Sequence, residues 1–370
     1  MIKAFSPIKL LLLLICLYSF TLFVTAQKKS TYKPTVIAYF SGNEAAAGRV
    51  QAEKLTHIIY SFCHLKGNRL NVDDARDSAT IKALVKLKSK NPELKVLLSL
   101  GGWGGCAPCS EVFSTAPNRK AFAASVKELN QYFGTDGIDL DWEYPTIPGH
   151  PGHRYAPEDK ENFTSLVNEL RKTMGKKQEI SFAAGGFPKF LEQSVDWKKV
   201  MEAVNRVNVM TYDLVGGYDT ITGHHTPLYS TGLQKESTDQ AVNYLISIGV
   251  PANKIVIGAA FYARVWENVE NINNGLGQKG KFKSFIAYRT FPQVLSEETG
   301  YQLFWDSTAH APYRYNASKK LFATHDDEKS IAEKTRYVMD KKLEGIMFWE
   351  LTLDKQEGGL LDVIVAEVKK

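Results

Sequence analysis

Short apolar segments recur along the chain with little polar alternation. Eight of them have the length of β-strands, at residues 35–40, 55–65, 95–102, 137–144, 179–186, 206–216, 254–264 and 344–352. Continuous apolar runs of this kind are typical of strands that are covered on both faces, as in parallel sheets. The pattern therefore predicts a buried sheet at the centre of the molecule.

Segments with a helical spacing of apolar residues lie between most of these strands. The clearest, residues 119–133, places an apolar side chain every three or four positions and stops at Gly134. Similar segments occupy residues 79–90, 158–174, 196–205, 238–248, 328–341 and 360–370. Eight strands that alternate with helices predict an α/β fold, the (β/α)8 or TIM barrel. A doubly wound open sheet is the alternative, and the presence of eight strands disfavours it.

The connection between the seventh and the eighth strand is much longer than a barrel helix needs. It contains three short strand-like segments and one helical segment, at residues 301–306, 311–315, 319–326 and 291–299. We therefore expect a small α+β insertion domain, residues 265–327, between strand 7 and helix 7 of a barrel domain that covers residues 27–370.

Residues 136–145, with the sequence DGIDLDWEYP, depart from the apolar pattern of the other strands. Alternate residues of a strand share a face, so Asp139, Asp141 and Glu143 point toward the barrel axis. Glu143 is the most C-terminal of the three and lies at the end of the barrel where active sites occur. A column of carboxyl groups cannot ionise fully at low cost, so one of them keeps a proton near neutral pH.

This arrangement suits general acid catalysis. We expect Glu143 to protonate a leaving-group oxygen, and Asp141 to turn between Asp139 and Glu143 while it orients the substrate. A Ca²⁺ or Mg²⁺ site and a purely structural network are the alternatives. A single strand presents its carboxylates in a line rather than around an ion, so we expect no metal.

These residues also resemble a known family. The segment DGIDLDWEYP is similar to the D-x-x-D-x-D-x-E signature of glycoside hydrolase family 18, the chitinases. The resemblance extends over nearly the whole chain after residue 26, through SLGGW at 99–103, MTYD at 210–213 and MFWE at 347–350. The segment FYAR at 261–264 is similar to the family's FYGR, with Ala263 in place of glycine.

The resemblance implies retaining hydrolysis of β-1,4 bonds in chitin or N-acetylglucosamine oligomers, without a cofactor. In this family the 2-acetamido group of the sugar acts as the nucleophile in place of a protein carboxylate. The implied catalytic residues are Glu143, Asp141, Asp139 and Tyr212. Trp349 would form the floor on which the sugar stacks, and the other expected substrate contacts are Asp213, Met210, Tyr144, Trp103, Tyr39 and Arg264.

Two other functions use the same barrel. A non-catalytic chitinase-like lectin would typically lack the acid, and this chain keeps Glu143. An endo-β-N-acetylglucosaminidase that acts on glycoprotein glycans would share the acid motif. The expected insertion domain and the MTYD segment favour chitin over glycoprotein glycans.

The N-terminal residues have the pattern of a secretory signal peptide. A basic stretch with Lys3 and Lys9 precedes an apolar run from Leu10 to Val24, and a small residue, Ala26, marks the expected cleavage site. The alternative is an uncleaved membrane anchor, for which the apolar run is short. We expect residues 1–26 to be removed and the protein to be secreted to the outside of the cell, with the periplasm and the cell surface as the alternative destinations.

The cysteines, histidines and charges add further expectations. The segment CAPC predicts a local disulfide between Cys106 and Cys109, with Cys63 free and buried, whereas a redox or metal role for the pair is disfavoured. The adjacent His224 and His225 are interpreted as loop structure. The formal charge of +6 falls to +4 without the signal peptide and is spread along the chain, so nucleic acid is a poor partner. We expect a monomer.

Overall fold

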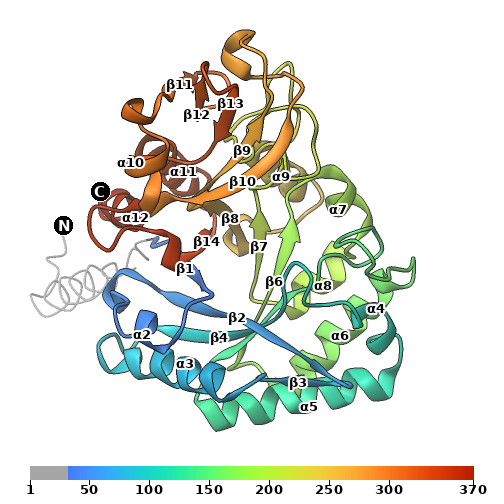
Figure 1. Ribbon diagram of the computed structural model, residues 1–370. Coiled ribbons are helices and arrows are strands. Elements are labelled where there is room, and N and C mark those ends of the chain that lie inside the picture. The colour runs from blue at the N-terminus through green and yellow to red at the C-terminus, as the bar shows by residue number, and fades with distance from the viewer. Residues whose placement is uncertain (1–31) are drawn as a thin grey trace, which may run out of the picture. The chain divides into compact units, whose positions relative to one another are not determined.

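Eight parallel strands close into a barrel in the computed structural model, which describes residues 32–370 (Figure 1). The strands are β1 (Thr35–Phe40), β2 (His57–Lys66), β4 (Lys95–Gly101), β5 (Gly137–Asp141), β6 (Glu179–Gly185), β7 (Arg206–Met210), β8 (Ile255–Ala260) and β14 (Gly345–Trp349). They follow one another around the barrel in this order, and β14 pairs with β1 to close it. The predicted (β/α)8 barrel is confirmed, and the predicted signal peptide lies outside the described residues.

Helices surround the barrel (Figure 1). The longer ones are α3 (Ala75–Lys86), α5 (Ala116–Phe133), α6 (Asp159–Met174), α8 (Trp197–Ala203), α9 (Thr238–Ser247), α11 (Glu328–Lys341) and α12 (Leu360–Val368). Short helical segments are α2 (Glu44–Ala47), α4 (Cys109–Val112), α7 (Pro188–Gln193) and α10 (Phe291–Val294). Local signals fix their ends: Thr115 caps α5 by accepting a hydrogen bond from the Asn118 amide, and Gly134 ends it with a φ of +73°.

The apolar side chains form separate layers inside and outside the barrel wall. The larger cluster lies between strands and helices and includes Ile138 and Leu140 of β5. A smaller cluster fills the barrel interior and includes Tyr39, Met210 and Met347. Strands covered on both sides in this way explain the lack of polar alternation in the sequence.

A second, antiparallel sheet follows β8. Its order is β10 (Lys281–Ala287), β9 (Tyr262–Glu267), β13 (Leu321–Thr324), β12 (Ala311–Asn316) and β11 (Gln302–Asp306). The predicted strand 254–264 is therefore wrong, because it consists of two strands in different sheets with only Phe261 between them. The sheet of the insertion begins at Tyr262, three residues before the predicted start of the domain.

Smaller features complete the fold. The short strand β3 (Arg69–Asn71) forms an antiparallel hairpin with the end of β2. The barrel and the second sheet belong to one unit, residues 34–370. Among residues 32–370, no helix has the length and apolar character needed to cross a membrane.

Candidate active site

Strand β5 carries two carboxyl groups into the barrel, and a third follows it. The strand ends at Asp141, earlier than the predicted residue 144, so Glu143 lies in the segment just after the strand. Trp142 points the other way, with its ring centroid 5.6 Å from that of Phe113 in the outer core. The alternation of sides that the sequence predicts is thus present in the structure.

Asp139 is the deepest of the three carboxyl groups and is fully buried. Its Oδ2 accepts hydrogen bonds from Tyr39 Oη at 3.1 Å and Ser99 Oγ at 3.0 Å. Its Oδ1 accepts from Ser181 Oγ at 2.6 Å and Asn208 Nδ2 at 3.1 Å. Burial raises the pKa of Asp139, and these four hydrogen bonds lower it. Because both of its oxygens accept hydrogen bonds, the Asp139 side chain is held in place at the bottom of the site.

This network changes the role of Tyr39. The sequence predicted Tyr39 as a substrate contact, but its side chain is only 1% exposed. Its hydroxyl donates to Asp139 and accepts a hydrogen bond from Asn208 Nδ2 at 3.2 Å. Tyr39 therefore supports the carboxyl column from below and does not face a substrate.

Asp141 lies above Asp139 with an unoccupied hydrogen-bond acceptor. Its side chain is 4% exposed, and its buried Oδ1 has no hydrogen-bond partner within residues 32–370. Burial raises the pKa of Asp141 well above its usual value, and the charges of Glu143 and Asp139 raise it further. An acceptor of this kind suits an N–H group of a ligand.

Glu143 is also buried in an environment that retains a proton. Burial raises the pKa of Glu143 to about 7, the nearby charge of Asp213 adds to the rise, and the Tyr144 hydroxyl opposes it. Because Asp141 and Glu143 influence one another, the pair holds at least one proton at neutral pH. This matches the expected state of a general acid.

Asp213 supplies a fixed negative charge near Glu143. Its carboxylate accepts two hydrogen bonds from the guanidinium of Arg264, and His225 Nδ1 lies 3.4 Å from its Oδ1. Burial would raise the pKa of Asp213, but Arg264 and His225 hold it well below its usual value. Asp213 therefore stays ionised.

The partners of Asp213 differ from the sequence prediction. Arg264 belongs to strand β9 of the second sheet, so one side of the site comes from the insertion. The structure separates the two adjacent histidines: His225 contacts Asp213, whereas His224 Nε2 lies 3.0 Å from Asp306 Oδ2. The interpretation of His225 as loop structure alone missed this contact. The sequence gives no signal for it beyond the nearby MTYD segment.

Tyr212 and Met210 lie at the end of β7. Tyr212 is 8% exposed, its hydroxyl is 3.9 Å from Met347 Sδ, and its ring is 6.4 Å from that of Tyr262. Burial raises the pKa of Tyr212 well above its usual value, and the charges of Tyr262 and Asp141 add to the rise. Tyr212 thus remains a hydrogen-bond donor close to Asp141. Met210 packs in the interior cluster.

Aromatic rings lie around these polar groups. Trp349, at the end of β14, is partly exposed and stacks on Phe62 with centroids 5.6 Å apart. Trp103 is 48% exposed and lies 6.3 Å from Tyr144 and 6.2 Å from the exposed ring of Tyr218. Neither Phe62 nor Tyr218 was predicted as a site residue from the sequence, although Tyr218 follows the MTYD segment closely.

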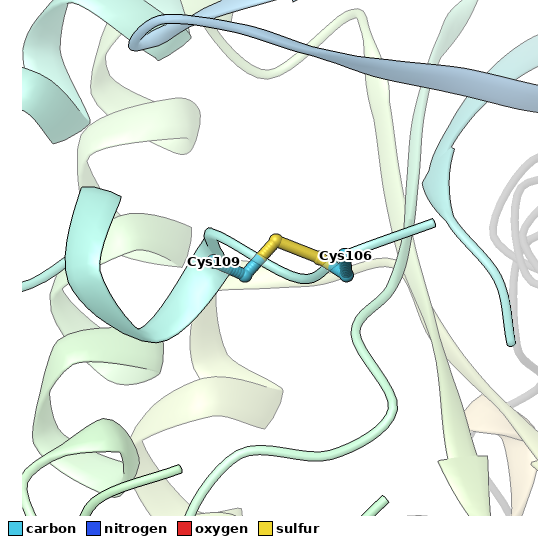
Figure 2. The surroundings of a disulfide bond; sticks show 2 residues. All are labelled: Cys106 and Cys109. Carbon is cyan, nitrogen blue, oxygen red and sulfur yellow. A yellow bond between two sulfur atoms is a disulfide. The ribbon is translucent and has the colours of Figure 1, made fainter. Parts of the chain in front are cut away.

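A disulfide lies in the loop that follows Trp103. Figure 2 shows Cys106 in the loop joined to Cys109 at the start of α4, and the Cα atoms are 5.3 Å apart. Both cysteines are buried, and Cys63 is a buried free thiol. Within residues 32–370, no group of three or more His, Cys, Asp or Glu side chains has an arrangement that could hold a metal ion.

Comparisons with known proteins agree with this geometry. The chain is 34% identical to Chitinase A1 of Niallia circulans over 305 residues, which is 76% of this chain and 43% of the relative. The chain therefore spans less than half the length of that chitinase.

Two solved structures resemble the fold. A family 18 N-acetylglucosaminidase from Paenibacillus barengoltzii is 35% identical with a TM-score of 0.83, and the match covers 90% of this chain and 99% of that one. The Group IV chitinase of Ostrinia furnacalis in complex with allosamidin is 26% identical with a TM-score of 0.82, over 90% and 98% of the two chains. The model of the glycosyl hydrolases family 18 matches residues 35–354. The chain belongs to family 18 of the glycosyl hydrolases.

Proposed function

We propose that the protein is a chitinase that hydrolyses β-1,4 bonds between N-acetylglucosamine units with retention of configuration. The observation that carries the proposal is the pair formed by Glu143, whose pKa is raised to about 7, and Asp141, whose buried Oδ1 has no partner among the described residues. One carboxyl group can give a proton, and the other can accept a hydrogen bond from the substrate.

In the first step Glu143 protonates the glycosidic oxygen. The carbonyl oxygen of the 2-acetamido group on the same sugar attacks C1, the bond to the leaving sugar breaks, and an oxazolinium ion forms. Because the nucleophile is part of the substrate, the attack gains the high effective concentration of an intramolecular reaction. Asp141 accepts a hydrogen bond from the acetamido N–H and stabilises the positive charge that develops.

In the second step water attacks C1 from the side that the leaving group vacated. Glu143, now ionised, takes a proton from this water, and the ring of the oxazolinium ion opens to give the retained product. Tyr212 orients the acetamido oxygen through its hydroxyl. Asp213 contributes by keeping a negative charge close to Glu143. Trp349 offers a partly exposed ring to the apolar face of the sugar.

The test is hydrolysis of the N-acetylglucosamine hexamer, followed by proton NMR of the products in the first minutes. Retention gives products that start as the β-anomer and equilibrate later. Glu143→Gln is the inactive control and should lower turnover by about 10²- to 10⁴-fold with the fold intact. Products that start as the α-anomer, or comparable cleavage of a β-1,4 glucose polymer without acetamido groups, would refute substrate assistance.

The similarity to the Paenibacillus N-acetylglucosaminidase over 99% of its length favours a second candidate, the release of N-acetylglucosamine units. The same hexamer separates the two, because terminal action gives monomer and pentamer first, whereas internal action gives dimers, trimers and tetramers. A high-mannose glycoprotein in a parallel assay tests action on glycoprotein glycans. Binding of the hexamer without any product would indicate a lectin.

We also propose that the protein is exported and acts as a monomer. Export rests on the sequence of residues 1–26. Fractionation of expressing cells and mass spectrometry of the mature N-terminus test cleavage after Ala26. Light scattering of the mature protein tests the monomer.

A further inference from the structure

A fully buried ion pair lies behind the site. Lys334, on α11, is 0% exposed, and its Nζ lies 2.7 and 2.8 Å from the two carboxylate oxygens of Asp326, which is also 0% exposed. Removing two charges from water is costly, and well-packed apolar residues often replace such pairs without loss of stability. The pair therefore calls for a role other than stability.

The two charged groups hold segments from different parts of the chain. Asp326 Oδ2 accepts a hydrogen bond from the amide of Ala260, the last residue of β8, at 3.0 Å. Asp326 Oδ1 accepts from Ser330 Oγ at 2.7 Å within the first turn of α11. Lys334 Nζ donates to Thr226 Oγ1, in the loop that follows β7. The pair thus links β8, α11 and this loop.

Thr226 links the ion pair to the backbone just before Tyr212. Its Oγ1 lies 3.1 Å from the carbonyl oxygen of Thr211, the residue before Tyr212. The Thr211 hydroxyl in turn donates to the carbonyl of Gly258 in β8 at 2.8 Å. Thr211 is therefore fixed by hydrogen bonds to Thr226 and Gly258, and it holds the backbone immediately before Tyr212.

The backbone that follows Asp213 is held by His225, the residue before Thr226. The amide of Leu214 donates to the carbonyl of His225 at 3.0 Å, and the amide of His225 donates to Thr324 Oγ1 at 3.1 Å. Between the two anchors Asp213 adopts a left-handed φ of +57°, which a non-glycine residue keeps only where its surroundings determine it strongly.

We propose that the Lys334–Asp326 ion pair positions the catalytic segment, because it fixes Thr226 and through it the backbone that carries Tyr212 and Asp213. Neither charged residue touches the reacting atoms, so both are positioning residues. This inference rests on the function proposed above.

Two variants test the connection. Lys334→Met combined with Asp326→Asn removes both charges and keeps the shapes. The asparagine side chain still offers a carbonyl oxygen to the Ala260 amide and an N–H group to Ser330 Oγ. Thr226→Val keeps both charged residues and removes the hydroxyl that contacts Lys334, Asp326 and the Thr211 carbonyl. Lys341→Met, an exposed lysine on the same helix, is the matched control.

We expect both test variants to keep a melting temperature within about 5 °C of wild type. With the hexamer, kcat should fall by about 10- to 100-fold while KM changes less. Hydrogen exchange of the Leu214 amide, which does not depend on activity, should become at least about tenfold faster because the loop is released. The Lys341→Met control should match wild type in every measurement.

An active wild-type protein, together with test variants of unchanged kcat and unchanged Leu214 exchange, would overturn the inference and leave the proposed function intact. An inactive wild-type protein would overturn the proposed function, and the exchange of Leu214 would still decide the positioning. If the double variant does not fold, Thr226→Val gives the answer alone.

Discussion

The proton that Glu143 retains near neutral pH has a cost in stability that increases with pH. Burial raises its pKa from the usual 4.5 to about 7. Between these two pH values the folded protein keeps the proton and the unfolded chain has lost it, so the free energy of unfolding falls as the pH rises. The loss is complete above about pH 7 and amounts to about 3 kcal/mol.

Glutamine has nearly the same shape and does not ionise, so Glu143→Gln removes this loss. We expect wild type and variant to have equal stability near pH 4, where the glutamate is protonated in both states. Above about pH 7 the inactive variant should be more stable by up to about 3 kcal/mol. Asp141 and Glu143 influence each other's ionisation. The stability difference between wild type and Glu143→Gln therefore reports the proton held by the two carboxyl groups together.

Urea unfolding followed by tryptophan fluorescence, at pH values from about 4 to 8, measures the difference. The matched control is Glu202→Gln on the exposed face of α8, whose curve should follow the wild type. Parallel curves for wild type and Glu143→Gln across the whole range would refute the reasoning, because Glu143 would then ionise equally in the folded and unfolded states.

Three further predictions concern the pH profile of activity, Asp141 and the disulfide. The kcat/KM for the N-acetylglucosamine hexamer should fall as the pH rises through about 7, because Glu143 must be protonated to act as the acid; a flat profile up to pH 9 contradicts this. Asp141→Asn should lower kcat by about 10²- to 10³-fold with a smaller change in KM, and near-normal turnover would exclude its role in stabilising charge. Replacing both Cys106 and Cys109 by alanine should lower the free energy of unfolding by about 2 kcal/mol, measured in urea, because the loop that the disulfide closes is short; equal stability of reduced and oxidised protein contradicts this.

Part of the site was predictable because it depends on local geometry. The period of two along a strand is enough to place Asp139 and Asp141 on the inner face and Ile138 and Leu140 in the outer core. Likewise the spacing of apolar segments is enough to predict the barrel. Nothing beyond neighbouring residues is needed for these predictions.

Other features depend on register between distant strands. The donors to Asp139 come from β1, β4, β6 and β7, and their positions follow from how these strands align around the barrel. For the same reason Tyr39 was predicted to face the substrate, whereas its hydroxyl is buried against Asp139. The sequence around a tyrosine at the end of a strand is the same whether its hydroxyl faces a substrate or is buried against another strand.

The break between β8 and β9 could not be found from periodicity. Residues 255–263 are apolar on both sides of Phe261, because Ile255–Ala260 lie in the barrel wall while Tyr262 and Ala263, which begin the second sheet, are buried in the interior cluster and the outer core. A change of sheet without a turn residue or a polar interruption leaves the hydrophobic pattern unchanged.

That single-residue junction has a mechanical consequence. A domain joined to the barrel by a long linker could swing open like a lid, but only one residue separates β8 from β9, and β9 carries Arg264 directly onto Asp213. Any large rotation of the insertion sheet would separate this charge pair and disturb the acid beside it. We therefore expect the insertion sheet to keep its position relative to the barrel during turnover of the proposed substrate.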